Sequence, residues 1–308
     1  ILIDQASGQD TRALLVMRHD GRILGEAYAE GFSAQTRFLG WSMSKTLTSV
    51  MIGSLQYRGV MPEKMNGPLF DAWQNDERSA ITLEHLLTST SGLAFEETYQ
   101  PGADATRMLF EDTSVTQRPL NKPLEHKPGE HWSYSSGTAN LLSALIFKRF
   151  GENPEAQRNY LDEYVLYPLG FAGGVLEEDV NGVYIGSSFT YATARAWASL
   201  GALFLNNGRM NGYQIVAPQF IRKVLSPNPS KNDSRYGYQL WLNQGNNDEP
   251  LRWPSLPADS FAARGSKGQV VMVVPEYNLV IARLGWSKEK YPVDQAMATV
   301  LDYLPRLR

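Results

Sequence analysis

Two hairpin patterns at opposite ends of the chain constrain its fold more than any other feature. Residues 14–28 place an Asp-Gly pair between two apolar runs, which is a strong short-range signal for two antiparallel strands. Near the other end, the turn-like residues 275–278 separate the β-branched runs 270–274 and 279–284. The strands near the two ends of the chain can pair with each other if they lie in one antiparallel sheet.

The segment between the hairpins has the spacing of helices. Apolar residues recur every three or four positions in runs that begin near residues 47, 141 and 197. A glycine follows each run, as expected where a helix ends, at Gly59, Gly151 and Gly208. A further amphipathic helix is predicted over residues 293–304.

These patterns predict an α/β fold of the α+β type. An antiparallel sheet built from both chain termini is flanked by helices, and a mostly helical lobe is added to it. We expect residues 1–60 and 209–308 to form the sheet lobe and residues 61–208 the helical lobe. The active site is expected in the cleft between the lobes.

Composition limits the classes of function. Hydrophobic residues make up 43% and charged residues 20% of the 308 residues, so the chain can bury a core. The net charge of −3 and the lack of long basic runs argue against a nucleic-acid partner. No run reaches the roughly 18 apolar residues of a membrane span. We therefore expect a small molecule, rather than nucleic acid, as the binding partner.

Two observations bear on localisation. The chain lacks cysteine, which excludes a thiol nucleophile and fits either an oxidising or a reducing compartment. It begins at Ile1 rather than Met, and a removed secretory leader is one interpretation of this. We expect a periplasmic or secreted protein, with a cytoplasmic one as the alternative.

The run 40–45 (GWSMSK) is the first candidate for chemistry. It leads into an apolar helix, with Ser42 at its start and Lys45 one turn later on the same face. A lysine can activate a serine hydroxyl if burial and the helix dipole lower the pKa of its amine. The same spacing recurs at Ser287 and Lys290, but in a charged segment after a strand, where we expect a surface location.

Two further segments could complete a site. Tyr134 lies at the entrance of the next predicted helix, where a phenol could relay protons; alternatively it packs on Trp132, and Ser136 or Thr138 caps the helix. Residues 263–269 (ARGSKGQ) precede a strand, and glycines there indicate either a close approach by a ligand or a simple turn.

Together these segments resemble the serine β-lactamase and penicillin-binding superfamily, in its class C-like branch with carboxylesterases and DD-peptidases. SMSK at 42–45 matches the first motif, YSS at 134–136 matches the second, and RGS at 264–266 lies where the family has Lys-Thr-Gly. The likeness extends over most of the chain through the runs LLTSTSGL (86–93), KPGEHWSYSS (127–136), RYGYQLW (235–241) and VVPEYNLVIARLG (273–285). The resemblance implies catalysis by Ser42, Lys45 and Tyr134 without a metal or another cofactor.

The resemblance also implies binding residues. In the family, the Lys-Thr-Gly strand helps to hold the carboxylate of penicillins and peptidoglycan peptides, so Ser136, Arg264 and Gly265 are candidates for substrate binding. Because this chain has Arg-Gly-Ser instead, we expect poor β-lactam hydrolysis. Residues 92–99 look most like the nylon-oligomer (aminohexanoate-dimer) hydrolases and related esterases, in which a tyrosine closes over an amide substrate; Tyr99 matches it.

Acyl transfer needs donors for the negative charge that develops on the carbonyl oxygen. The start of a helix leaves the backbone N–H of Ser42 available. The second donor would be the backbone N–H of Ser266, provided that the edge of its strand faces the cleft, as the resemblance implies.

Other functions remain open from sequence. A Ser-His-Asp hydrolase of the α/β type needs a late histidine, but the last one is His131. His126 and His131 match no His-Glu-x-x-His zinc pattern. A DD-carboxypeptidase, a class C-like β-lactamase, and a sensor or binding protein that is acylated without turnover remain alternatives to an ester or linear-amide hydrolase.

Overall fold

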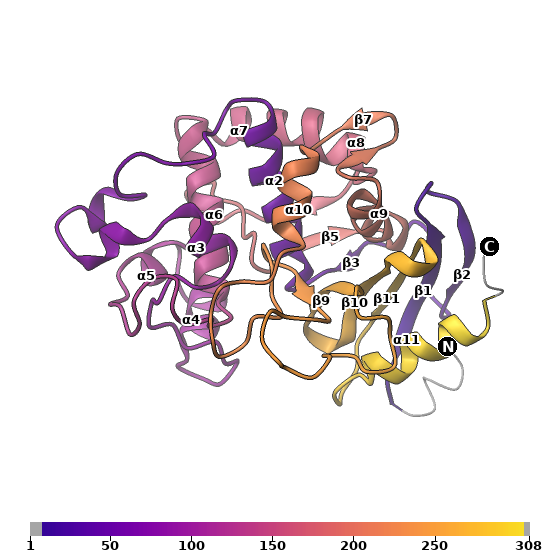
Figure 1. Cartoon of the computed structure of the whole chain (residues 1–308). Coiled ribbons are helices and arrows are strands. Elements are labelled where there is room, and N and C mark those ends of the chain that lie inside the picture. Colours follow the sequence, from indigo (N-terminus) through magenta and orange to yellow (C-terminus); the bar gives the residue numbers. More distant parts are fainter. Residues whose placement is uncertain (1–7, 305–308) are drawn as a thin grey trace.

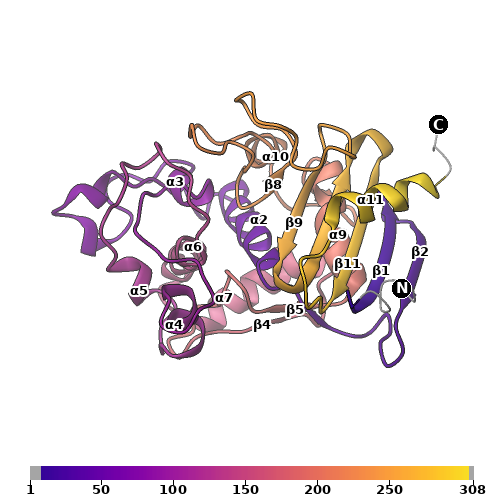
Figure 2. The same ribbon diagram turned by 90° about the horizontal axis from the view of Figure 1, so that it is seen from below.

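The structure is a computed structural model, and it describes residues 8–304. Its centre is a six-stranded sheet in the order β2-β1-β11-β10-β9-β8, with every neighbouring pair antiparallel. The first and last segments of the chain therefore lie side by side in one sheet (Figures 1 and 2). This confirms the predicted fold class. The strands are β1 (Thr11–Arg18), β2 (Ile23–Tyr28), β8 (Trp241–Leu242), β9 (Phe261–Gly265), β10 (Gln269–Val274) and β11 (Leu279–Gly285).

Both predicted hairpins are present. β1 and β2 are paired across the turn that contains Gly21, which has a φ of 85°. β10 and β11 are paired across a turn in which Asn278 takes the left-handed conformation that Asn tolerates. β1 then pairs with β11, with Leu15 opposite Ala282, so the two hairpins form four consecutive strands of the sheet, from its edge strand β2 to β10.

Alternation along the strands separates the two faces of the sheet. Val271 and Val273 belong to the main core, together with residues of α2 (Met43–Tyr57) and α9 (Ala194–Leu205). Val270 and Met272 instead pack with the terminal helix α11 (Val293–Asp302). Helices therefore cover both faces (Figure 2), which explains why these strands are apolar at consecutive positions.

The helical part of the molecule surrounds α6 (Ser136–Arg149), which packs against α2. The helices here are α3 (Leu83–Leu87), α4 (Asp104–Phe110), α5 (Gln117–Leu120), α7 (Pro154–Leu161) and α8 (Tyr167–Leu169), and α10 (Pro218–Val224) follows later in the chain. Small sheets join β3 (Phe38–Leu39) and β4 (Val175–Leu176) to β5 (Thr190–Ala192), and β6 (Arg209–Met210) to β7 (Tyr213–Gln214). α9 covers the large sheet although it belongs to the segment 61–208.

Helix lengths also bear on membranes. Within residues 8–304, none of the helices combines the length and the apolar character needed to cross a lipid bilayer.

Candidate active site

The first feature of the site is a tight junction ahead of α2. A side chain at Gly40 would meet the indole of Trp197 at 2.2 Å, and one at Gly265 would meet the carbonyl oxygen of Gly40 at 2.2 Å. Trp41, between Gly40 and Ser42, has a φ of 47°, which is strained for a bulky residue. The junction thus holds Ser42, the residue preceding α2, beside the end of β9.

Lys45 lies one helical turn after Ser42 with its side chain buried, at 1% exposure. Its Nζ donates hydrogen bonds to Ser42 Oγ at 3.0 Å, Ser136 Oγ at 2.9 Å and the Ser187 carbonyl oxygen at 3.0 Å. Burial lowers the pKa of Lys45 to about 8, and the negative charge of Glu97 opposes this shift. A substantial fraction of the amine is therefore neutral near pH 8 and can accept a proton from Ser42.

Tyr134 lies two residues before α6 and borders the same amine. Its ring stacks on Trp241 with centroids 5.1 Å apart, and Lys45 Nζ lies 4.9 Å from the ring centroid. Burial raises the pKa of Tyr134 well above its ordinary value, against the opposing effect of the Ser42 hydroxyl. The phenol therefore stays protonated around neutral pH and can donate a proton. The group beside Ser42 that can accept a proton is the amine of Lys45.

Ser136 connects the amine to a carboxylate that the sequence analysis missed. Its backbone N–H donates to Glu97 Oε2 at 2.6 Å, and its Oγ donates to Glu97 Oε1 at 2.5 Å. Ser136 is the first residue of α6, so Glu97 also lies at the positive end of that helix. The capping hydroxyl is that of Ser135, which accepts from Thr138 N–H at 3.0 Å.

Nothing in the sequence links Glu97 to Ser136, since the two are far apart in the chain and meet only through the fold. A second missed residue is Ser187, whose carbonyl oxygen accepts from Lys45. The one sequence feature that points to Glu97 is its position two residues before Tyr99, a candidate for substrate binding.

The loop that carries Glu97 also places Tyr99 over the serine. Partial burial and the charge of Glu97 raise the pKa of Tyr99, while hydrogen bonding with the hydroxyls of Ser266, Ser42 and Ser136 opposes the rise. Tyr99 is still 45% exposed, so it lies at the rim rather than in the core. The structure therefore brings Ser42, Ser136, Ser266 and Tyr99 around one point.

Asp104 anchors the loop that carries Glu97 and Tyr99. Its Oδ2 accepts from the backbone N–H of Glu96 at 3.0 Å, and Glu96 in turn accepts from Ala105 N–H at 3.1 Å. Lys122 at 2.5 Å and Arg118 at 3.6 Å pair with the Asp104 carboxylate. The loop is thus anchored through its backbone, and the side chains of Glu97 and Tyr99 are free to face the site.

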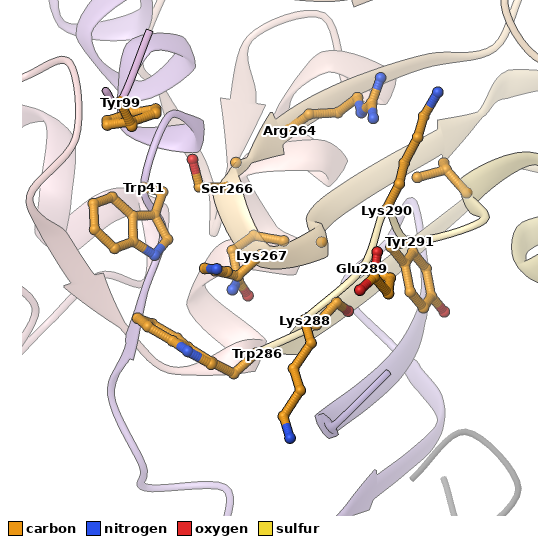
Figure 3. Close-up of a pocket in the computed structure, with 15 residues that line it drawn as sticks. Trp41, Tyr99, Arg264, Ser266, Lys267, Trp286, Lys288, Glu289, Lys290 and Tyr291 are labelled. Atoms are coloured by element: carbon orange, nitrogen blue, oxygen red, sulfur yellow. The ribbon is translucent and has the colours of Figure 1, made fainter. Parts of the chain in front are cut away.

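A cavity of about 650 Å³ extends from this point along the end of β9 (Figure 3). Trp41 and Trp286, with ring centroids 6.1 Å apart, form an aromatic wall. Three lysines and one glutamate also line it, so its balance is cationic: Lys267, Lys288, Glu289 and Lys290.

Arg264 lines the same cavity and is half-buried. Its guanidinium lies 5.7 Å from the Trp241 ring centroid, and burial together with nearby Arg252 lowers its pKa. Within residues 8–304 it has no ion-pair partner, whereas Arg252 is paired with Asp233 at 2.9 Å. The cavity therefore offers a guanidinium that is not paired with a carboxylate of the described residues.

The glycines near Ser266 fit the turn interpretation at Gly268, which has a φ of 78°. Gly265 lines the cavity, but its missing side chain makes room for the Gly40 carbonyl rather than for a ligand. A side chain at Gly268 would lie 2.6 Å from the Arg283 guanidinium. Close packing within the protein thus favours glycine at both positions, and the positive φ adds to this at Gly268.

The second serine–lysine pair also differs from its prediction. Ser287 is buried, not at the surface, and its Oγ donates to the Gln9 carbonyl at 2.8 Å and accepts from Arg283 at 3.0 Å. Lys290 is exposed, so the two residues do not meet. The segment after β11 is irregular rather than helical, so it lacks the one-turn geometry that brings Lys45 to Ser42.

The histidines do not assemble a metal site in the described part of the chain. His126 and His131 stack on each other with ring centroids 4.0 Å apart. Residues 8–304 contain no group of three or more His, Asp or Glu side chains placed to hold a metal ion.

The sheet built from the first and last strands of the chain, with a serine–lysine–tyrosine cluster beside the end of β9, defines a hydrolase-type protein of the β-lactamase and penicillin-binding fold. The chain belongs to the Beta-lactamase family, whose model matches residues 5–302.

Individual similarities agree with this family. A Bacillus anthracis protein named "Putative 6-aminohexanoate-dimer hydrolase" has a TM-score of 0.76 at 20% identity, covering 99% of this chain and 83% of that one. A family VIII carboxylesterase has a TM-score of 0.71 at 13% identity, covering 97% and 95%. An uncharacterized protein of Alkalihalophilus pseudofirmus, BpOF4_21049, is 26% identical over 224 residues, which are 66% of this chain and 59% of that protein. The chain thus spans less than two thirds of that relative's length.

Proposed function

We propose that this protein is a serine hydrolase that forms an acyl-enzyme at Ser42 with an ester or a linear amide. The observation that carries the proposal is the buried Lys45 amine, 3.0 Å from Ser42 Oγ, at the start of an apolar helix. An amine with a pKa near 8 is a competent base for a serine hydroxyl.

Acylation follows from this arrangement. Ser42 Oγ attacks the substrate carbonyl carbon, and its proton passes to the neutral Lys45 Nζ. The tetrahedral intermediate collapses as the bond to the leaving group breaks, and Tyr134 gives its phenolic proton to the departing oxygen or nitrogen. The Lys45 ammonium then returns a proton to Tyr134, and the acyl group stays on Ser42.

Deacylation uses the same groups in the reverse sense. A water molecule attacks the acyl carbonyl while Lys45 accepts its proton, and Ser42 Oγ leaves and recovers a proton. In both steps the backbone N–H groups of Ser42 and Ser266 are proposed to stabilise the oxyanion. Support comes from the location of Ser42 at a helix start and from the Ser266 side chain beside the same Tyr99 phenol.

The cavity supports a second candidate substrate class. Lys267, Lys288, Lys290 and the unpaired Arg264 suit a substrate that ends in a carboxylate, such as a D-Ala-D-Ala peptide. The names of the similar structures favour linear amides and esters, so a screen should compare a neutral ester, a carboxylate-ended linear amide and a D-Ala-D-Ala peptide.

Acyl-enzyme formation can be tested by intact-protein mass spectrometry with a fluorophosphonate and with p-nitrophenyl acetate. We expect one adduct on Ser42, its loss in Ser42→Ala, and steady turnover of the ester. Ser44→Ala is the matched control, because within residues 8–304 that buried hydroxyl has no hydrogen-bond partner. An adduct that persists in Ser42→Ala contradicts the assignment, and a stoichiometric burst without turnover indicates an acylated sensor instead.

A further inference from the structure

The Lys45 amine lies among three oxygen atoms whose hydrogen-bonding roles are not equal. The Ser187 carbonyl oxygen, 3.0 Å away, can only accept. Ser136 Oγ, 2.9 Å away, could in principle donate or accept. However, the Ser136 hydroxyl gives its hydrogen to Glu97 Oε1, and the Ser136 N–H is held by the other oxygen of the same carboxylate. Ser136 therefore presents only lone pairs to Lys45.

This assignment determines where the lone pair of a neutral amine points. A neutral lysine has two N–H groups and one lone pair in a tetrahedral arrangement. The two N–H groups are taken by Ser136 Oγ and the Ser187 carbonyl, which both must accept. The remaining direction is that of Ser42 Oγ, 3.0 Å away, so the lone pair faces the hydroxyl whose proton it has to remove.

We propose that Glu97 is a positioning residue for acylation: by fixing the Ser136 hydroxyl as an acceptor, it directs the lone pair of Lys45 at Ser42. This inference rests on the proposed function. Glu97 acts through Ser136 and has no contact with the reacting atoms in this role.

The alternative arrangement shows what Glu97 prevents. If the Ser136 hydroxyl were free to rotate, its hydrogen could point at the lone pair of Lys45. The amine would then donate to Ser42 Oγ rather than accept from it, and the nucleophile would keep its proton. Glu97 excludes this rotamer of the Ser136 hydroxyl. Its two carboxylate oxygens can only accept, so the Ser136 hydroxyl and the Ser136 N–H must both donate to them.

Glu97 is also the charged group that acts on Lys45 most directly. The groups around the amine are Ser42 on its own helix, Tyr134 and Ser136 at the start of α6, and Tyr99 on the loop of Glu97. Of these and Glu97, the glutamate is the one whose charge shifts the pKa of Lys45. Its charge raises the pKa of Lys45 against the larger effect of burial. Removing that charge should therefore lower the pKa of Lys45.

The experiment compares Glu97→Gln with Glu96→Gln, which makes the same change of charge at an exposed neighbour whose side chain accepts from the Thr98 hydroxyl at 3.2 Å rather than from Ser136. For a neutral ester, kcat of Glu97→Gln should fall by about tenfold to a hundredfold while KM changes less than about threefold, as expected for lost positioning. The acidic limb of the pH–rate profile should move to lower pH. Glu96→Gln should behave like the unmodified chain in all three measurements.

Ser136→Ala supplies an independent measurement, which also serves if Glu97→Gln does not fold by circular dichroism. We expect Ser136→Ala to lose kcat to a similar extent, and Glu97→Gln to add less than about threefold in the Ser136→Ala background, because the two act in series.

The outcomes separate this inference from the function on which it rests. If the unmodified chain neither forms the Ser42 adduct nor turns over the ester, the proposed function is wrong. If it turns over the ester but Glu97→Gln matches Glu96→Gln, or Ser136→Ala keeps full kcat, the positioning role alone is wrong. The positioning role is also wrong if Glu97→Gln loses kcat additively with Ser136→Ala and its pH–rate profile does not move.

Discussion

The chain contains the same spacing of serine and lysine twice, and the fold treats the two copies differently. Ser42 precedes a helix, so Lys45 returns to it one turn later and donates to its Oγ at 3.0 Å. Ser287 follows a strand, so Lys290 points elsewhere, and the Ser287 N–H is bound to the Lys267 carbonyl at 3.1 Å. The same spacing of three residues therefore brings the lysine amine to the serine hydroxyl where a helix follows the serine, and not where the serine follows a strand.

The sharpest way to test this contrast is to remove each lysine. Lys45→Met should lower kcat/KM for a neutral ester by on the order of 10² to 10⁴, because the general base is lost. Lys290→Met should change that value less than about threefold and should weaken only carboxylate-ended substrates. Steady-state kinetics on both substrates measure this, and equal losses in the two variants would show that the two copies are not different in function.

The oxyanion donor gives the next largest effect. Ser266→Pro deletes a backbone N–H and should reduce kcat by about 10² or more, whereas Ser266→Ala keeps it and should retain most activity. Circular dichroism checks that the proline variant is folded. If alanine is as damaging as proline, the hydroxyl is the working group; a folded and active proline variant removes Ser266 from the oxyanion hole.

The pH dependence follows from the lowered pKa of Lys45. The amine is active when neutral, so kcat/KM for a neutral ester should rise about tenfold per pH unit below about 8 and level off above it. A lysine with an ordinary pKa would give a rise that continues toward pH 10. An initial-rate profile in buffers of constant ionic strength distinguishes the two, and a flat profile between about pH 5 and 9 argues against a lysine base.

The smallest effect on activity is expected from Ser287→Ala. Its hydroxyl joins Gln9 and Arg283 in a buried position, so the variant should lose about 1 to 3 kcal/mol in the free energy of unfolding. Ester turnover by the folded variant should stay within about twofold. Urea denaturation measures the first quantity, and a large loss of kcat without a loss of stability would assign Ser287 a role in the site.

The sequence predicted those features that depend on local periodicity. The Asp-Gly hairpin, the apolar helix after Ser42 and the location of Tyr134 before α6 all follow from neighbouring residues, and they sufficed to bring Ser42 and Lys45 together. Glu97 and the Ser187 carbonyl were missed because Glu97 meets Ser136, and the Ser187 carbonyl meets Lys45, only through the packing of segments that are distant in the sequence. The burial of Ser287 was missed for the same reason: its partners Gln9 and Arg283 are apparent only once β1 is paired with β11.

The pairing of β1 with β11 also has a kinetic consequence. These two central strands are separated by almost the whole chain, so the contact order of the sheet is high, and its folding should be slow compared with that of the helices. During synthesis, the first hairpin leaves the ribosome long before β10 and β11 are translated. Until then, the edge of β1 that later pairs with β11 has no partner strand. Because Ser266 lies in the turn between β9 and β10, a nascent chain can form the Ser42–Lys45 helix before Ser266 reaches its place in the site. Catalytic competence should therefore appear only after the last strand of the sheet has been translated.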